Sequence, residues 1–360
     1  MSKIHVIIPV YNAKRFLREA VDSVLNQPYK DIDIVLVNDG STDGSDVLCD
    51  EIASNEERVS VIHQANAGVS AARNAGIECV LKQCENEDYI AFLDADDIWV
   101  QNALTEDIAK GMVCKNAIYA FGGMRCVETM SHFSVPYTYT PSVCNGSDAI
   151  WKYKGEFCAN IYSVALIKQW NIRFIKGLKY SEDKIFQMQC TYLSTEVQYL
   201  PEILFVYRNN PASAMNRQST ITPIDKYLPI INSWVKSDNF LNSYESISGK
   251  HICAGYVLAG IYFMDMAADH YKRWGKRSEI EKVFREHPYF YLFEQMRPKD
   301  VSTLQYKNHN LLLKHPLLFK WKYNLIGAAE YIVRLLLSPS PLQKWWIHRR
   351  YPLTQMPTND

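Results

Sequence analysis

Three aspartates stand directly after the apolar run 89–93, in the segment Asp94-Ala95-Asp96-Asp97. An apolar run that ends in acids is typical of a buried strand that reaches the edge of a sheet. In open parallel α/β sheets, ligands bind outside the carboxyl ends of the strands. Crowded carboxylates repel one another, and a divalent cation that carries a phosphate would relieve this repulsion. The same residues also fit an acidic loop in which Asp97 caps a following helix, so both interpretations stay open.

Two earlier strand ends carry residues suited to binding a nucleotide. The first predicted strand ends at Pro9, which leaves Tyr11 at the same edge, where an aromatic ring can stack on a base. The second, over 33–37, is followed by Asp39 in a loop rich in Gly, Ser and Thr. Its carboxylate could accept an imide N–H such as that of uracil. The alternatives are core packing with Asn12 as a helix cap, and ordinary turn chemistry after the second strand.

A third strand end is followed by small residues from Asn66 onward, which permit a ligand to approach closely. Arg73 in this segment could bind a phosphate or a base carbonyl, or form an ordinary surface ion pair. An aromatic ring, an acid, an arginine and an acid cluster therefore follow four successive strands. Because the carboxyl ends of parallel strands meet at one edge, the sequence predicts a single binding site there.

The pattern of elements predicts the fold that would position these residues. Strands at 4–8, 33–37, 59–62 and 89–93 alternate with helices at 13–27, 43–55 and 68–81. This alternation predicts an α/β fold with a mostly parallel sheet and helices on both faces. The predicted fold continues with helices at 103–115 and 181–192 and with strands at 117–122 and 200–207. Beyond about residue 220 the periodicity is helical, which predicts a C-terminal helical region.

Charge and cysteine usage narrow the class of protein. Residues 1–100 hold 18 Asp and Glu against 8 Lys and Arg, which argues against nucleic acid as a ligand of this half. The nine cysteines contain no CxxC pair, which favours free thiols in a reducing cytoplasm over disulfides or zinc. The sequence shows no signal-peptide pattern and no uncharged run long enough to span a membrane. A cytoplasmic protein is expected.

Taken together, the segments 9–12, 37–43, 66–76 and 92–97 resemble the large family of inverting, nucleotide-sugar-dependent glycosyltransferases with the GT-A fold and a DxD motif. The resemblance covers roughly residues 3–215. It implies one GT-A domain, with a nucleotide-sugar-binding half over 1–100 and an acceptor-binding, catalytic half over 101–219. A helical accessory domain would follow over 220–313, and an amphipathic, basic and aromatic tail over 314–360.

The resemblance also implies roles at the donor site. By position, it assigns a UDP-sugar to Pro9, Tyr11, Asp39, Asn66, Arg73, Asp94, Arg208 and Ser213. In the family's pattern, Tyr11 would stack on the uracil and Asp39 would accept its N3–H, while Arg73 would contact base or phosphate. Asp94 would hold the ribose side of the donor. Asp96 would ligate the Mn²⁺ or Mg²⁺ that bridges the diphosphate, with Asp97 as a supporting acid.

The segment around Glu182 and Asp183 resembles the family's Glu-Asp pair at the start of a helix, which contains the general base. An inverting transfer needs a carboxylate to take the proton of the acceptor hydroxyl, and we assign this role first to Asp183 and second to Glu182. Acids in a first helical turn also complement the helix dipole, which is the structural alternative. Arg208 and Ser213, with Arg217 just beyond, would stabilise the departing UDP.

The function implied is the transfer of a sugar from a UDP-sugar to a hydroxyl of a glycan or lipid-linked acceptor. The setting would be the synthesis of a capsule, O-antigen or lipo-oligosaccharide. One alternative is a sugar nucleotidyltransferase, although residues 9–14 lack the glycine-rich basic loop that a triphosphate requires. A non-catalytic nucleotide-binding scaffold is another. The donor sugar, the acceptor and the choice between Mn²⁺ and Mg²⁺ cannot be read from the sequence.

The last part of the chain predicts a membrane contact. Residues 314–350 hold seven Lys and Arg and one acid, and large apolar residues recur at helical spacing from Leu317 to Leu337. Aromatic and basic residues without a spanning length are typical of an interfacial anchor on an anionic membrane. A helix packed on its own domain with a solvated basic face fits equally well. The helices before it would support the acceptor side or a homodimer.

Overall fold

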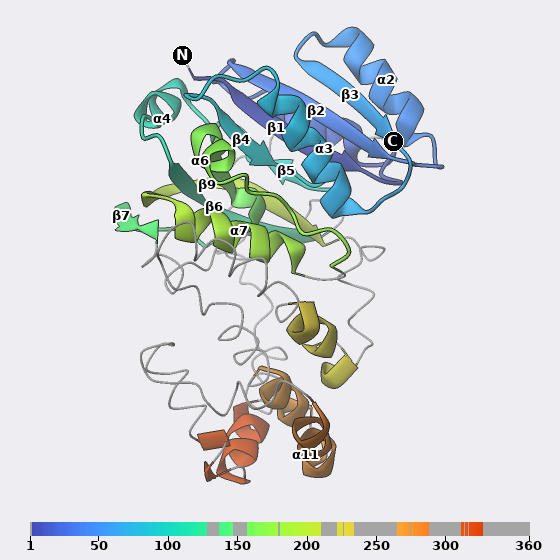
Figure 1. Ribbon diagram of the computed structural model, residues 1–360, viewed down its shortest axis with the longest axis vertical. Helices are drawn as coiled ribbons and strands as arrows, with labels where there is room; N and C mark the ends of the chain where they lie inside the picture. The colour runs from blue at the N-terminus through green and yellow to red at the C-terminus, as the bar shows by residue number, and fades with distance from the viewer. Residues whose placement is uncertain are drawn as a thin grey trace, which may run out of the picture. The chain divides into compact units, whose positions relative to one another are not determined.

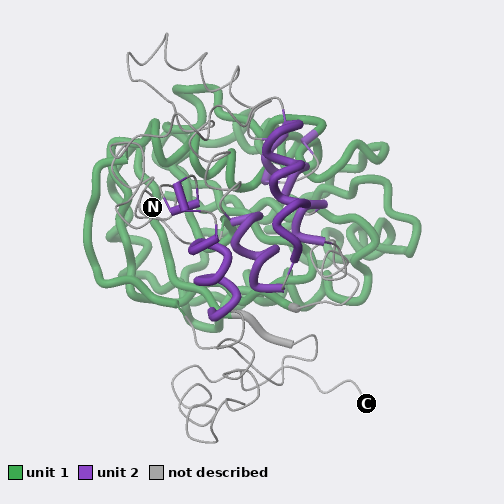
Figure 2. The backbone as a smooth tube through the Cα atoms, turned by 90° about the horizontal axis from the view of Figure 1, so that it is seen from below, with its two compact units in different colours: residues 1–177, 182–213, 341–360 green, residues 178–181, 214–340 purple. Residues whose placement is uncertain are grey.

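The computed structural model describes residues 2–127, 137–146, 157–178 and 181–209, and shorter stretches beyond them. These are 222–225, 227–233, 265–273, 275–287, 311–312, 314–315 and 317–326. The chain divides into two compact units, coloured separately in Figure 2. The described residues up to Gly177 and from Glu182 to 209 lie in the first unit, and those from 222 on lie in the second.

A nine-stranded sheet forms the centre of the first unit (Figure 1). Its order is β3-β2-β1-β4-β8-β6-β9-β5, and β7 pairs with β9. The strands are β1 (Ile4–Val10), β2 (Ile32–Asp39), β3 (Val59–Gln64), β4 (Tyr89–Phe92), β5 (Ile98–Trp99), β6 (Ala117–Val127), β7 (Ser142–Asn145), β8 (Asn160–Ser163) and β9 (Glu196–Asn209).

The carboxyl ends of six strands, β1 to β4, β6 and β9, lie at one edge of this sheet. Strands β1 to β4 pair parallel to one another, and β6 pairs parallel to β9. Strand β8 is antiparallel to both β4 and β6, so β6 and β9 run in the same direction as β1. The predicted α/β fold with a mostly parallel sheet is therefore confirmed, with antiparallel pairs only where β5, β7 and β8 join.

Amphipathic helices flank this sheet, as the sequence predicted. They are α1 (Leu17–Leu25), α2 (Ser45–Asn55), α3 (Val69–Leu81), α4 (Glu106–Gly111), α6 (Val164–Gln169) and α7 (Glu182–Leu193), with a 3₁₀ turn η1 (Phe157–Ala159). The buried residues of α1 are Leu17, Ala20, Val21, Val24 and Leu25, spaced as one helical face. Strand β1 is buried on both faces, which accounts for its continuous β-branched run.

Several predicted bounds were wrong for identifiable reasons. Strand β9 begins at Glu196 and not near Leu200, and Pro201 lies within it. The pairing of β6 with β9 shifts register between Ala120 and Gly122, opposite residues 200–202. A bulge can accept a proline because no ladder hydrogen bond is needed there. The helix predicted over 103–115 is only α4, and the strand predicted over 117–122 is β6, which continues to Val127.

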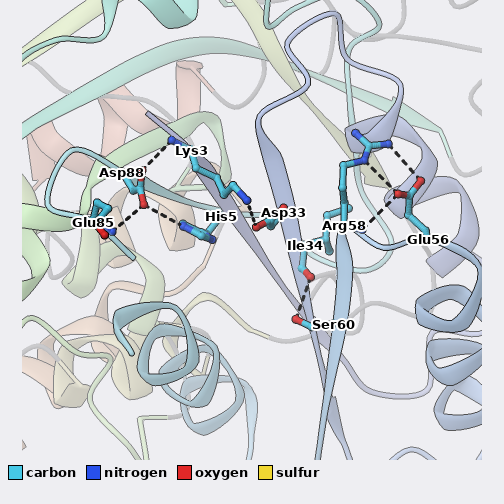
Figure 3. A network of polar contacts seen from close by, with 9 residues as sticks. All are labelled: Lys3, His5, Asp33, Ile34, Glu56, Arg58, Ser60, Glu85 and Asp88. Atoms are coloured by element: carbon cyan, nitrogen blue, oxygen red, sulfur yellow. Dashed lines mark hydrogen bonds and ion pairs between the residues drawn. The ribbon is translucent and has the colours of Figure 1, made fainter. Parts of the chain in front are cut away.

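A network of charges joins the amino ends of the strands, at the edge opposite the predicted site (Figure 3). Lys3 pairs with Asp33 at 2.7 Å, and its backbone N–H donates to Asp88 at 2.8 Å. His5 Nε2 lies 3.5 Å from Asp88 Oδ2. Burial lowers the pKa of His5, although Asp88 opposes this shift. These contacts hold β1, β2 and the start of β4 together far from the carboxyl ends.

The second unit is helical in its described parts, as predicted beyond about residue 220. Its elements include the segment 265–273, α11 (Arg277–Glu286) and the segment 317–326. Phe319 is fully buried and packs edge-on to Tyr271, with ring centroids 6.2 Å apart. No helix within the described residues is both long and apolar enough to cross a bilayer.

Replacing Gly76 of α3 by alanine is expected to destabilise the protein by about 1–3 kcal/mol. A Cβ at this position would lie 2.4 Å from Cγ2 of Ile7, which is fully buried in β1. Urea unfolding followed by circular dichroism measures the change. The matched control is Gly111→Ala in α4, where no atom lies within 4 Å of the new Cβ. A Gly76 variant as stable as this control would contradict the close packing of α3 on β1.

Candidate active site

The loops after β1 and β2 are tied together beside an exposed aromatic ring. Tyr11 follows β1 and is 54% exposed. Asn12 has a left-handed φ of 51°, and its Oδ1 accepts a hydrogen bond from the Thr42 N–H at 2.8 Å. Its own N–H donates to Ser41 Oγ at 3.1 Å. Asn12 is therefore not the cap of α1, whose N-cap residue is Phe16; it fixes the backbone that presents Tyr11.

Asp39 ends β2 and is almost fully buried. One carboxylate oxygen accepts from Gln64 Nε2 at 2.7 Å and from the Ala67 N–H at 2.8 Å. The other accepts from the Gly68 N–H at 2.9 Å. Asp39 thus holds the segment before α3 against β2, and Asn66 lies exposed within this segment. The role predicted for Asp39 with uracil would use the lone pairs that these three bonds leave.

The three aspartates after β4 occupy different environments. Asp94 and Asp96 are partly exposed, whereas Asp97 is buried. Asp97 Oδ1 accepts a hydrogen bond from the Arg208 N–H at 2.7 Å. Burial raises the pKa of Asp97 well above its usual range, and the charges of Asp96 and Asp94 raise it further. The helix cap considered for Asp97 is wrong, because residues 98 and 99 form strand β5.

Arg73 of α3 lies beneath this acidic cluster. Its side chain is only 4% exposed, and its Nη2 donates to Asp94 Oδ1 at 2.7 Å. Nη1 donates to Glu182 Oε1 at 3.1 Å. Burial lowers the pKa of Arg73, but Asp94 and Glu182 outweigh it and raise the pKa overall, so the guanidinium is charged. The surface ion pair considered for Arg73 is wrong, because this arginine is buried with two partners.

The predicted acid pair begins α7. Glu182 is largely buried, and desolvation followed by the charge of Asp183 raises its pKa, while Arg73 opposes the shift. Asp183 is partly exposed, and its Oδ1 accepts from the Lys184 N–H at 2.7 Å. The preceding residue, Ser181, has a left-handed φ of 63°, which sets where the helix starts. The structure therefore brings the start of α7 to the carboxyl edge of β4.

Arg208 of β9 reaches the same edge and is buried. Its Nε donates to the backbone oxygen of Asp96 at 2.7 Å, and its Nη2 pairs with Glu19 of α1. The guanidinium lies 4.8 Å from the centroid of the Phe16 ring. The predicted partners Ser213 and Arg217 lie outside the described residues, as does most of the predicted tail.

Comparison with known proteins identifies the first part of the chain. Residues 5–140 match the model of glycosyl transferase family 2. This part of the chain belongs to that family. The match includes the strand ends that carry Tyr11, Asp39, Arg73 and the aspartates after β4.

Similar proteins match a longer stretch of the chain. Glycosyltransferase GlyA of Streptococcus pneumoniae is 35% identical over 220 residues, which are 58% of this chain and 30% of GlyA. The uncharacterized glycosyltransferase EpsJ of Bacillus subtilis is 30% identical over 229 residues, 58% of this chain and 62% of EpsJ. The matched stretch is therefore less than two thirds of either relative.

A solved structure shares the fold of this chain. The crystal structure of Staphylococcus aureus TarS 1–349 in complex with UDP-GlcNAc superposes with a TM-score of 0.55 at 19% identity. The superposition covers 88% of this chain and 89% of the TarS chain. The predicted GT-A fold is thus confirmed.

No three Asp, Glu, His or Cys side chains converge as a metal site anywhere in the described part of the chain. A cation here would therefore need ligands from elsewhere. Mg²⁺ is commonly held by one or two carboxylates together with phosphates of a substrate. The partly exposed Asp96 and Asp94 fit that arrangement. The pKa of Asp97 is raised first by burial and then by the charges of Asp96 and Asp94, which a cation would offset.

Sequence reasoning missed the partners that hold the two arginines. Glu19 is an ordinary acid in the first turn of α1, and nothing in the sequence relates it to Arg208. Phe157 and Phe174 flank Arg73, with centroids 5.1 and 5.3 Å from its Cζ atom. Phe157 belongs to the 3₁₀ turn η1, and Phe174 follows α6. These contacts join residues far apart in sequence, so no local spacing could have revealed them.

Asp39→Asn is expected to lower the free energy of unfolding by about 1–3 kcal/mol. The amide keeps one acceptor oxygen, but its NH₂ group turns toward backbone N–H groups that now donate to the carboxylate. Denaturant unfolding measures the loss. The control is Asp31→Asn, an exposed position before β2, for which a change within about 0.5 kcal/mol is expected. Equal stability of the two variants would contradict the role of Asp39 in holding the segment before α3.

Proposed function

We propose that this chain is an inverting glycosyltransferase that moves a sugar from a UDP-sugar to a hydroxyl of a glycan acceptor. One observation carries the proposal: Arg73 joins Asp94, after β4, to Glu182, at the start of α7. An acidic loop suited to a nucleotide diphosphate and a helix suited to supply a base thereby share one edge of the sheet. Family 2 membership of residues 5–140 supports the same reaction class.

The donor is proposed to bind along the ends of β1 to β4. Tyr11 offers an exposed ring on which uracil can stack, next to the buried carboxylate of Asp39. Pro9 and the exposed Asn66 line the same edge. A UDP-sugar is the donor class in the structure of TarS, which shares the fold. Asp94 would hold the ribose side of the donor while it remains paired with Arg73.

Asp96 is the main residue proposed to bind a metal ion. Asp96 would hold Mn²⁺ or Mg²⁺ against the donor diphosphate, with Asp94 beside it. When bound, the cation supplies Lewis-acid neutralisation of the charge on the departing UDP. Arg208 would add positive charge there after leaving Glu19, its partner in this structure, and Ser213 is proposed to help.

Asp183 is the proposed general base. Its carboxylate takes the proton of the acceptor hydroxyl as that oxygen attacks the anomeric carbon, and the bond from this carbon to UDP breaks on the opposite face. The anomeric configuration is therefore inverted. Glu182 is less suited to this role, because Arg73 occupies Oε1 and the side chain is only 16% exposed. The partly exposed Asp183 is open to an acceptor.

The acceptor is proposed to be a cell-surface glycan or its lipid-linked precursor. The minor teichoic acid biosynthesis protein GgaA of Bacillus subtilis is 39% identical over 103 residues, 28% of this chain and 22% of GgaA. This relative supports a surface polymer as the product. The alternatives of a sugar nucleotidyltransferase and of a non-catalytic scaffold find no comparable support among the relatives described above.

Two variants separate the donor role from the base role. Asp96→Ala is expected to lose the Mn²⁺-dependent part of UDP binding, because its carboxylate would hold the cation. Asp183→Asn should bind UDP normally but lose roughly 10²–10⁴ in turnover, the usual share of a general base. Calorimetry with and without Mn²⁺, and release of UDP from UDP-sugars, measure the two effects.

The control for this pair is Asp107→Asn, an exposed acid of α4 whose change should leave both quantities unaltered. Loss of Mn²⁺-dependent UDP binding in Asp183→Asn, with normal UDP binding but lost turnover in Asp96→Ala, would overturn the assigned roles. Wild-type protein that binds no UDP in any condition would instead favour another nucleotide or the scaffold alternative.

Peripheral membrane association is a second proposal, and it rests on the helical segment 317–326. Leu317, Leu318, Trp321 and Leu325 are between 51% and 65% exposed. At 3.6 residues per turn they fall within about 100° of the helix circumference. Phe319 is buried and lies on the opposite side of the helix. The helix is therefore apolar on two sides, and one of them is exposed.

The charges beside this exposed side favour an anionic lipid surface. Lys320 and Lys322 lie at its margins, and the sequence from 301 to 329 contains no acid. Lysines that flank an exposed Leu and Trp face are typical of interfacial helices. The alternative of a helix that exposes only its basic side does not account for four exposed large apolar residues.

Leu317→Glu combined with Trp321→Glu is expected to abolish flotation of the full chain with vesicles that contain phosphatidylglycerol. The acids remove apolar area and add charge that anionic lipid repels. A matched control is Val47→Glu combined with Val113→Glu, two residues of the first unit that are 67% and 77% exposed. Equal flotation of both double variants would contradict this membrane face, and flotation with neutral vesicles would remove the electrostatic part of the proposal.

A further inference from the structure

Arg73 connects two segments that are far apart in the sequence. It stands in the second turn of α3, 21 residues before Asp94 and 109 residues before Glu182. Each terminal nitrogen of its guanidinium serves one of these carboxylates, at 2.7 and 3.1 Å. The planar fork of arginine can hold two acids in fixed directions, which a lysine ammonium cannot do as well. Arg73 therefore links the loop after β4 to the first turn of α7.

Aromatic rings fix the position of this guanidinium. Phe157 and Phe174 lie near it, within cation–π distance. Phe174 stacks on Phe186 of α7, with centroids 4.1 Å apart and planes 5° apart. Phe92, the last residue of β4, contacts all three of these rings. The two rings beside the arginine thus pack against Phe92 of β4 and Phe186 of α7, the two elements that carry its acid partners.

Stability alone is a poor explanation for such an arrangement. A buried ion pair seldom contributes more to stability than apolar residues of the same volume, because both charges must leave water. The surroundings of Arg73 are already aromatic, so an apolar side chain would suit them. What an apolar side chain could not do is hold Asp94 and Glu182 at set directions. The arrangement therefore favours a geometric role in the site.

The contacts of Arg73 also argue against direct binding of the donor. Its side chain is 4% exposed, and both terminal nitrogens already donate to protein carboxylates. Each terminal nitrogen keeps a second N–H, but the side chain is so little exposed that a diphosphate could reach it only after the surrounding side chains had moved. This differs from the contact with base or phosphate that the sequence resemblance implied.

We propose that Arg73 is a positioning residue that holds Asp94 and Glu182 and thereby sets Asp183 against the donor edge of the sheet. The proposal rests on the proposed function, in which Asp183 is the base. Glu182 is then the anchor of α7. Its hydrogen bond to Arg73 fixes the first turn of the helix, and Asp183 is the next residue in that turn. Arg73 acts through these two acids and touches neither donor nor acceptor.

Hydrogen exchange of the ligand-free protein tests this without any activity. In Arg73→Met, exchange in 94–97 and 182–186 is expected to become on the order of tenfold faster, as local openings lose their restraint. The strands β1 and β2 should stay protected. The control Arg173→Met removes an arginine that pairs with another acid of α3, the largely exposed Glu78 at 2.7 Å, and should match wild type in both segments. Unchanged exchange in both segments of Arg73→Met would overturn the proposal.

Arg73→Lys carries the same test if the methionine variant fails to fold, because lysine keeps the charge but not the fork. In turnover assays with this variant, kcat is expected to fall roughly 10²-fold, as a misplaced reacting group would cause. The Kd for UDP should stay within about threefold of wild type. A large loss of UDP affinity with kcat retained would assign Arg73 to the donor and overturn the positioning role.

Combining Arg73→Lys with Glu182→Gln adds a further readout. If Arg73 acts through Glu182, the kcat of the double variant should be little lower than that of the worse single variant. Independent roles would instead multiply the two losses in kcat. Failure of the proposed function is visible separately. Wild type that neither binds UDP nor turns over any UDP-sugar contradicts that function, while the exchange experiment still decides the role of Arg73.

Discussion

Strand β1 pairs with parallel neighbours on both sides, and this pairing fixes where the candidate site can lie. Ile4 is in register with Ile32 of β2 and with Tyr89 of β4. Because the strand is buried on both faces, its backbone groups have no partner other than these neighbours. A slip of one residue would move every side chain of β1 to the opposite face of the sheet and disrupt the packing on both faces. The ends of β1, β2 and β4 are therefore held at one edge, and the acids and the aromatic ring at those ends are held with them.

The same constraint explains what the sequence could predict. The strands with continuous β-branched runs, and the order of the first four strands and three helices, follow from periodicity within the first hundred residues. That Tyr11, Asp39 and Asp94 share one edge follows from the parallel order alone. The later strands were harder to predict. Strand β5 has only two residues, and the bulge opposite 200–202 hid the length of β9.

The contacts that tune the site could not be predicted, because they join distant segments. Arg73 meets Glu182 across 109 residues, and Arg208 meets Glu19 across 189 residues. The sequence patterns singled out both arginines, but the acids that pair with them in the folded chain could not be read from the sequence. Likewise, Asn12 and Asp97 looked like helix caps because polar residues before apolar runs are typical of caps. In the folded chain, Asn12 bonds to the neighbouring loop and Asp97 to the backbone of β9.

The position of β8 in the sheet has a consequence for the co-translational folding of this chain. The residues that match the family model end at 140, yet β8 spans Asn160–Ser163 and lies between β4 and β6 in the sheet. Until β8 has been synthesised, β4 has no partner on that side and β6 cannot join the sheet through it. Glu182, the second partner of Arg73, is synthesised later still. A nascent chain that ends at residue 140 therefore leaves β4 with an open edge, and the sheet can be completed only after β9 has been translated.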